Sequence, residues 1–286
     1  MSVKVIVDSA SDINIADAKE MGVTVVPLKT YFGDEEYLDG VTLDANGFYE
    51  KLAIFGEKPR TSQISPYDFS LVFKEELNKG NEVICIDLSK LLSGCYQSAC
   101  IAKQDLESES IYPVDSKSAS VGEIIMVQLA LKLAEEGKTG KEISDILNSK
   151  ADDLKVVILL ESLDYLTSGG RINASAAQTN LNGVRPIVSI EDGKVVMKGK
   201  ARGIKSGYEL LNQIVEECGG IDFNLPFALG YSGLSDKMVI KYREEYKNLF
   251  NTNNAKDVKY FQMGCTIGSH LGPNAVAVAF FAKNNN

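Results

Sequence analysis

Ser93 and Gly94 stand at a point where the chain is expected to turn from a buried strand into a helix. The apolar run Val83–Ile86 predicts the strand, and the run Tyr96–Leu106, which has few helix breakers, predicts the helix. Free backbone N–H groups and the helix dipole favour an anion at a helix start, and glycine lets a ligand head group come close. Ser93 either donates its hydroxyl to such an anion or only caps the helix.

The single histidine of the chain, His270, lies in the glycine-flanked stretch Gly268–Pro273, for which we expect a loop between strands. With Ser93 as nucleophile and an acid such as Asp115, it would complete a hydrolytic triad. A serine hydrolase acting on a small acyl ester through Ser93 and His270 is therefore the alternative function. The residues around Ser93 lack the G-x-S-x-G elbow that exposes a strained nucleophile, and this favours binding over hydrolysis.

Arg171 and Arg202 are the two arginines that stand beside glycines in expected loops rather than on helix faces. Each is either a ligand- or partner-binding group or an ordinary solvated charge. One histidine without clustered carboxylates offers no metal site. The sequence also lacks a G-x-G-x-x-G motif and a Walker lysine motif, so we expect neither a metal nor a nucleotide cofactor.

The composition describes a soluble globular chain with an acidic balance. Its 286 residues carry a formal net charge of −9, which argues against a nucleic-acid partner. No apolar run approaches the roughly 20 residues needed to span a bilayer, so we expect at most transient membrane contact. Five scattered cysteines without a C-x-x-C pair are typical of reduced thiols, and they predict a cytoplasmic location.

The order of the expected elements predicts two α/β domains. Strands alternate with helices over residues 1–154, which indicates a domain with a mostly parallel sheet. Residues 155–286 add a hairpin signature at Glu191–Gly193 to further β-α-β units, which indicates a mixed sheet. We also expect a polar loop over Lys58–Pro66, a helix over Asn173–Leu181 and one charged helix over Asp236–Phe250.

Five blocks of the sequence together resemble the DegV family. In chain order they are Val5–Asp12, Thr61–Ser65, Leu92–Ala99, Leu163–Ile172 and Ile267–Pro273, and they run over nearly the whole chain. The resemblance implies two α/β domains that hold a long-chain fatty acid, such as palmitate, in an apolar tunnel between them. Some members of the family are the acyl-carrying subunits of bacterial fatty acid kinases, and these present the carboxylate to a separate ATP-binding subunit.

The resemblance also implies roles for single residues. Thr61 and Ser93 match the hydroxyl residues that bind the fatty acid carboxylate, and His270 matches the histidine of the same polar network. Their neighbours in the same blocks, Ser62 and Gly94, are included among the expected ligand-binding residues. Arg171 matches an arginine near the carboxylate, and Arg202 is the candidate for a second. We expect both at the tunnel mouth, where they would serve phosphoryl transfer with a kinase partner.

Overall fold

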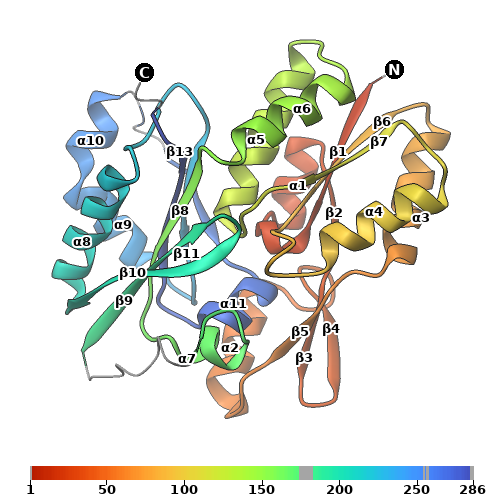
Figure 1. Cartoon of the computed structure of the whole chain (residues 1–286). Coiled ribbons are helices and arrows are strands. Elements are labelled where there is room, and N and C mark those ends of the chain that lie inside the picture. Colours follow the sequence, from red (N-terminus) through yellow and green to blue (C-terminus); the bar gives the residue numbers. More distant parts are fainter. Residues whose placement is uncertain (1, 174–182, 254, 256–257, 284–286) are drawn as a thin grey trace.

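The computed structural model describes residues 2–173, 183–253, 255 and 258–283. Two α/β halves lie side by side, one built on a four-stranded sheet and the other on a six-stranded sheet (Figure 1). The predicted fold class is therefore confirmed. The predicted helix over Asn173–Leu181 lies, apart from Asn173, outside the described residues.

The first sheet is parallel throughout and has the strand order β2-β1-β6-β7. Five of the six residues of β6 are buried, as expected for a central parallel strand that is covered on both faces. The strands are β1 (Val3–Asp8), β2 (Thr24–Val26), β6 (Glu82–Asp87) and β7 (Ile111–Asp115). The helices of this half are α1 (Ile15–Met21), α3 (Pro66–Asn78), α4 (Cys95–Asp105), α5 (Val121–Glu135) and α6 (Gly140–Lys150), after the short 3₁₀ helix η1 (Ser9–Ser11).

The second sheet is mixed and has the strand order β10-β9-β8-β13-β11-β12. Only the pair of β11 and β12 is parallel. The predicted hairpin turn is confirmed, because Asp192 and Gly193 both have positive φ angles between β9 and β10. The strands are β8 (Leu154–Leu159), β9 (Val184–Glu191), β10 (Lys194–Arg202), β11 (Phe227–Tyr231), β12 (Tyr260–Gln262) and β13 (Val276–Phe281). The helices are α7 (Asp164–Ser168), α8 (Ile204–Glu217), α9 (Lys237–Glu245), α10 (Lys247–Thr252) and α11 (Cys265–Leu271).

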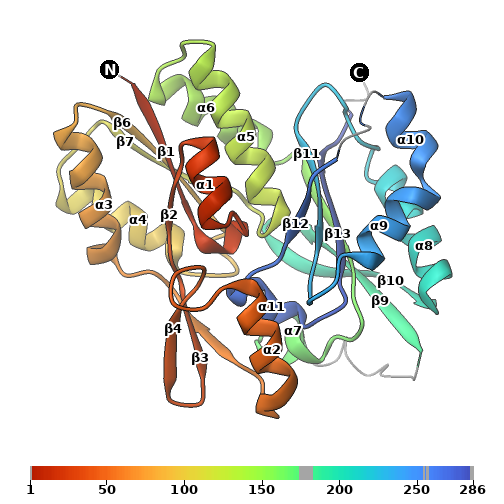
Figure 2. The same ribbon diagram turned by 180° about the vertical axis from the view of Figure 1, so that it is seen from behind.

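A small third sheet with the order β4-β3-β5 extends from the first half and, together with helix α2 (Ala45–Phe55), reaches α11 of the second half (Figure 2). Its strands are β3 (Lys29–Phe32), β4 (Glu35–Leu38) and β5 (Arg60–Ser62). α11 packs so closely on α2 that a Cβ at Gly268 would lie 2.5 Å from the Phe48 ring. Within the predicted loop over Lys58–Pro66, residues Arg60–Ser62 form strand β5, so Thr61 lies on a strand and this part of the prediction is corrected. The pairing partner of β5 is some thirty residues away, so local composition does not reveal it.

Helix α5 lies between the two large sheets and contacts strands of both. Residues Val121 to Val127 are all buried, and all of them except Glu123 are apolar or glycine, as expected for a helix enclosed on every side. One continuous apolar core therefore includes residues of the parallel sheet and of the mixed sheet. The predicted domain boundary at residue 154 falls where β8 begins, and it stays a prediction because the core does not divide there.

Two further elements differ from the prediction. The helix expected over Asp236–Phe250 is divided into α9 and α10 at Tyr246, whose φ and ψ of −106° and 22° are not helical. His270 lies in α11 rather than in a loop. None of the helices in the described ranges is long and apolar enough to cross a membrane.

Candidate functional site

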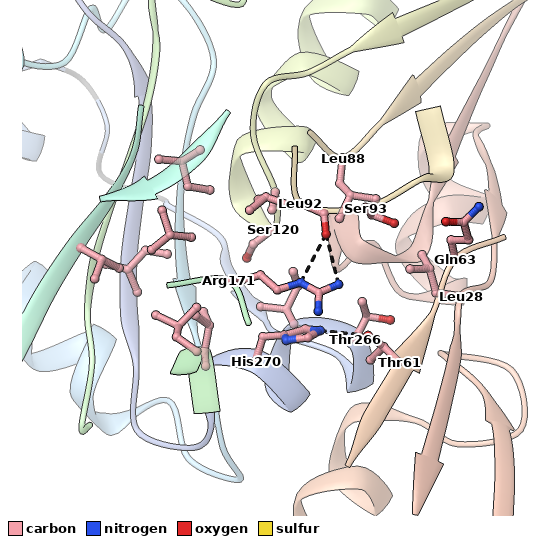
Figure 3. Close-up of a pocket in the computed structure, with 18 of the residues that line it drawn as sticks. Leu28, Thr61, Gln63, Leu88, Leu92, Ser93, Ser120, Arg171, Thr266 and His270 are labelled. Atoms are coloured by element: carbon pink, nitrogen blue, oxygen red, sulfur yellow. Dashed lines mark hydrogen bonds between the residues drawn. The ribbon is translucent and has the colours of Figure 1, made fainter. Parts of the chain in front are cut away.

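A cavity of about 330 Å³ lies between the loops of the parallel sheet and the face of the mixed sheet (Figure 3). Both halves of the molecule contribute to its lining. The apolar lining residues are Leu28, Leu88, Leu92, Ala119, Ile158, Leu166, Val188, Ile190, Val195, Ile267 and Leu271. The others are Thr61, Ser62, Gln63, Ser93, Gly94, Ser120, Arg171, Thr266 and His270. Such a lining suits an amphiphile with a long apolar part and one polar group.

Thr61 and His270 form a pair inside this cavity. The Thr61 Oγ1 and the His270 Nε2 are 2.9 Å apart, although 209 positions separate the two residues in the sequence. Burial, with a smaller contribution from the nearby charge of Arg171, lowers the pKa of His270 to about 4. The imidazole is therefore neutral at neutral pH. If the proton is on Nε2, the Nε2–H group donates a hydrogen bond to the Thr61 oxygen. The threonine hydroxyl is then free to donate its own hydrogen bond to a ligand.

Gly169 makes room for this histidine. A Cβ at position 169 would lie 2.3 Å from the His270 Nδ1, which is far inside van der Waals contact. The Nδ1 atom is buried and has no hydrogen-bond partner among the described residues. The first glycine of the Gly169-Gly170-Arg171 block is thus required by the close approach of the imidazole.

Ser93 lies two residues before the first residue of helix α4 and makes only long hydrogen bonds. Its hydroxyl donates to the Cys95 Sγ at 3.3 Å and accepts from the Cys95 N–H at 3.4 Å. Gly94 is the N-cap residue, and a Cβ there would lie 2.0 Å from the Gln63 Oε1. Gly94 lines the cavity, and its close neighbour is the end of the flexible Gln63 side chain, which would have to shift for a Cβ. The reason given from the sequence, the approach of a ligand head group, stays a prediction.

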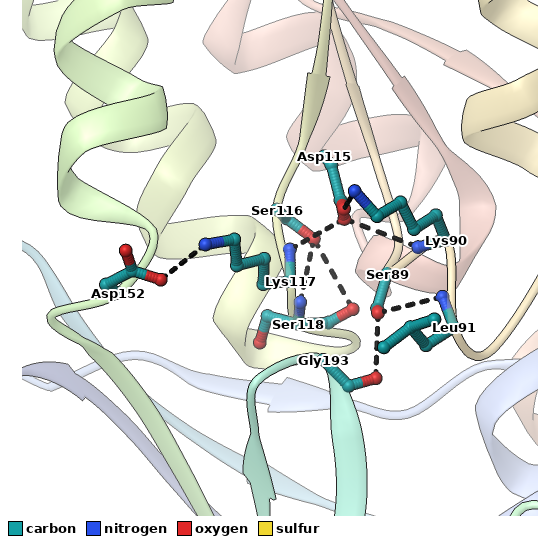
Figure 4. Close-up of polar contacts among 9 residues, drawn as sticks. All are labelled: Ser89, Lys90, Leu91, Asp115, Ser116, Lys117, Ser118, Asp152 and Gly193. Atoms are coloured by element: carbon teal, nitrogen blue, oxygen red, sulfur yellow. Dashed lines mark hydrogen bonds and ion pairs between the residues drawn. The ribbon is translucent and has the colours of Figure 1, made fainter.

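The loop that carries Ser93 is anchored to both halves of the molecule (Figure 4). The Lys90 N–H donates to the Asp115 Oδ1 at 3.3 Å, and the Lys90 ammonium lies 3.4 Å from the Asp115 Oδ2. The Ser89 hydroxyl donates to the Gly193 carbonyl at 2.8 Å, which connects the loop to the turn between β9 and β10. These contacts fix the position of Ser93 relative to the mixed sheet.

Arg171 bridges the two halves at the edge of the cavity. Its Nε and Nη2 donate to the Leu92 carbonyl at 3.3 and 3.1 Å, and its Nη1 donates to the Gly169 carbonyl. The guanidinium is partly buried, and burial lowers its pKa. It forms no ion pair with an acid of the described part of the chain. A positive charge held only by carbonyls at a cavity wall suits an anionic ligand.

Arg202 is exposed at the end of β10 and does not line the cavity. It pairs with Val184, four residues before the cavity residue Val188 on β9, which corresponds to about 13 Å along the strand. The expectation that it shares the tunnel mouth with Arg171 is therefore corrected. Arg202 is the last residue of β10, at the end of the strand that lies away from the cavity. The prediction failed because the glycine beside Arg202 indicated a loop.

The triad geometry of the alternative function is not assembled. The His270 Nε2 contacts Thr61 rather than Ser93, and its Nδ1 has no acid to orient it among the described residues. Asp115 instead accepts from the Lys90 and Lys117 N–H groups. A hydrolase needs the nucleophile, the base and the acid in hydrogen-bond sequence, so the geometry favours binding.

Three polar lining residues were not predicted from the sequence, namely Gln63, Ser120 and Thr266. The Thr266 Oγ1 is buried without a hydrogen-bond partner among the described residues. Thr266 lies one helical turn before His270, so the two side chains share a face of α11. That spacing would have revealed Thr266 had a helix been expected there. No cluster of three or more potential metal ligands occurs in the described ranges.

Comparison with known families gives a match over nearly the whole chain. Residues 2–283 match the family described as "uncharacterised protein, DegV family". A DegV domain-containing protein of Caldanaerobacter subterraneus subsp. tengcongensis is 32% identical, covering 98% of this chain and 99% of that protein. One of Clostridium perfringens is 30% identical, covering 97% and 98% respectively.

Solved structures give the same result. A DegV family protein from Thermus thermophilus, described by its fatty acid binding, has a TM-score of 0.87 at 28% identity, covering 99% of this chain and 100% of that one. DegV from Bacillus subtilis, described as a fatty acid binding protein, has a TM-score of 0.83 at 25% identity with the same coverage. A stearic acid-binding protein from Eubacterium ventriosum has a TM-score of 0.82 at 25% identity, covering 98% of each chain.

Proposed function

The chain belongs to the DegV family, and we propose from this membership and from its cavity that it binds one long-chain fatty acid, such as palmitate. The acyl chain would occupy the apolar part of the cavity. The carboxylate would lie at the polar end, against Thr61 and Ser93. The observation that carries the proposal is a mainly apolar cavity with hydroxyl groups and an arginine without an acidic partner in its wall.

The donors at the polar end suit a carboxylate. An ionised carboxylate offers about four acceptor positions, and burying it without donors is costly. Thr61, Ser93 and Arg171 supply three donors, and the unpartnered Thr266 hydroxyl can supply a fourth. Burial of the chain would add about 0.8 kcal/mol for each CH₂ group.

In the same proposal the protein is a non-catalytic subunit. It would carry the fatty acid in the cytoplasm and present the carboxylate to a separate ATP-binding kinase subunit, which forms the acyl phosphate. Arg171 in the cavity wall supports this role, because its guanidinium keeps N–H groups beyond the three given to carbonyls, and these could serve a bound carboxylate. Arg202 would then act only as a surface contact for the partner.

The direct test is organic extraction of the purified protein followed by mass spectrometry. We expect about one equivalent of intact long-chain fatty acid. Delipidated protein should melt at a higher temperature with palmitate than without it, because a ligand of the folded state stabilises by mass action. Methyl palmitate, which has the same chain but no carboxylate, should stabilise much less. Equal stabilisation by the ester would contradict a carboxylate site. Hydrolysis of the ester would support the alternative function, a serine hydrolase.

Removal of single hydroxyls should weaken binding. We expect Thr61→Val, Ser93→Ala and Thr266→Val each to raise the dissociation constant of a fluorescent fatty acid about 5- to 150-fold, because a charged acceptor loses a donor worth about 1–3 kcal/mol. Thr30→Val is the matched control, since Thr30 is also buried with an unpartnered hydroxyl but does not line the cavity. Wild-type affinity in the first three variants, or equal weakening in the control, would refute these assignments.

A further inference from the structure

Helix α11 begins without a side-chain cap of its own. The first N–H groups of a helix have no partner within the helix and need an acceptor when they are buried. Here the Gly264 N–H donates to the Asp12 Oδ1 at 2.8 Å, and the Cys265 and Thr266 N–H groups donate to the two oxygens of Asp39 at 3.0 and 2.8 Å. Both acids come from the N-terminal half of the chain.

Asp39 is built into this position. Only 3% of its surface is exposed, and its Oδ2 also accepts from the Ser9 hydroxyl at 3.3 Å. Its own N–H donates to the Leu28 carbonyl at 3.0 Å, which fixes the backbone directly after β4. A Cβ at Gly264 would lie 3.0 Å from the Asp39 Oδ1, so a larger residue there would crowd the carboxylate.

The capped helix carries two of the polar lining residues of the cavity, Thr266 and His270. Strand β5 of the small sheet brings Thr61 to within 2.9 Å of His270. In the same sheet β4 ends at Leu38, directly before Asp39. One three-stranded sheet thus holds both ends of the helix segment that faces the ligand: Asp39 at its first turn and Thr61 at its last.

We infer that Asp39 is a positioning residue of the acyl site, which sets the place of Thr266 and His270 relative to Thr61 by capping α11 from the opposite half of the molecule. The inference rests on the proposed function where it concerns the fatty acid. Without the carboxylate, two buried N–H groups lose their acceptors. The first turn of α11 then has to move toward water or toward other acceptors, and the imidazole moves with it.

The test uses the fact that His270 is the only histidine, so a histidine-labelled protein gives one imidazole signal in NMR spectra. In the wild type this signal should titrate near pH 4. In Asp39→Ala we expect its midpoint to move toward the ordinary value of 6.5 and palmitate affinity to fall at least tenfold. Asp39→Asn, which keeps one acceptor oxygen, should lie between the two.

Asp44→Ala is the matched control, because Asp44 caps α2 through the Gly47 N–H at 2.8 Å but does not line the cavity. It should leave the His270 titration and the affinity unchanged. A wild-type titration of His270 in Asp39→Ala would overturn the inference. If that variant does not fold, Asp39→Asn decides: a shifted midpoint supports the inference, and an unshifted one overturns it. If wild-type protein binds no fatty acid, the proposed function fails, and the titration still tests Asp39.

Discussion

Replacement of Arg171 by alanine should lower acyl phosphate formation with a cognate kinase subunit and ATP at least tenfold, while fatty acid still copurifies. Negative charge on a transferred phosphoryl group needs positive donors, and the arginine fork can supply two at once. The Arg171 guanidinium lies in the cavity wall and gives three of its N–H groups to the carbonyls of Leu92 and Gly169. The remaining N–H groups can serve the reacting carboxylate and phosphoryl group.

Arg202→Ala is the comparison that separates transfer from docking. The sequence predicts the same loss for both arginines, whereas the structure places Arg202 outside the cavity lining. A contact with the partner surface affects encounter more than chemistry, so a higher concentration of the kinase subunit should restore Arg202→Ala but not Arg171→Ala. Full activity of Arg171→Ala at low partner concentration would leave this arginine as a structural bridge between the Leu92 and Gly169 carbonyls.

A second large effect is expected from pH. Raising the pH from 6 to 8.5 should lower the free energy of unfolding of the ligand-free protein, because several carboxyl groups are buried where β1 and β6 end. Burial, assisted by the charge of Asp39, raises the pKa of Asp8 to about 7. Burial, followed by the charge of Asp8, also raises the pKa values of Asp87 and Glu123. Neither Glu123 oxygen has a hydrogen-bond partner among the described residues.

The sign follows from proton linkage. The unfolded chain releases the Asp8 proton near its ordinary pKa of 3.8, whereas the folded chain keeps it up to about 7. The folded state binds more protons in this window, so stability falls as the pH rises, by up to about 1.4 kcal/mol per pH unit for each such group. The raised pKa values of Asp87 and Glu123 act in the same direction. His270 acts in the opposite sense, chiefly between about pH 4 and 6.5, so it offsets part of the loss at the lower end of the chosen range.

Urea unfolding at the two pH values measures this effect. Glu123→Gln removes one ionisable group from the buried cluster, so it should lose less stability than the wild type between pH 6 and 8.5. Glu135→Gln is the control on the same helix, because Glu135 is exposed. It should follow the wild type at both values. An unchanged wild-type midpoint between pH 6 and 8.5 would show that these carboxyl groups are not held protonated.

The local pattern of the sequence was sufficient for most of the elements. Alternating apolar and helical segments predicted the parallel sheet, because each segment's periodicity reflects the face that it buries. Asp192-Gly193 predicted the turn of the β9–β10 hairpin, because these residue types accept positive φ angles. Ser93 was expected at a strand-to-helix junction, and it lies between β6 and α4, directly before the N-cap Gly94. These features depend on near neighbours in the chain.

The site itself depends on contacts between distant segments. Thr61 and His270 are partners across 209 positions, and Asp39 caps a helix 226 residues away. The sequence around His270 predicted a loop. It did not show the helix, because the acceptors that complete the first turn of α11 come from the other half of the molecule. Arg171 and Arg202 both stood beside glycines, yet only Arg171 reached the cavity. Sequence periodicity reports which face of a segment is buried, whereas the partner that it meets is decided only when the two halves pack together.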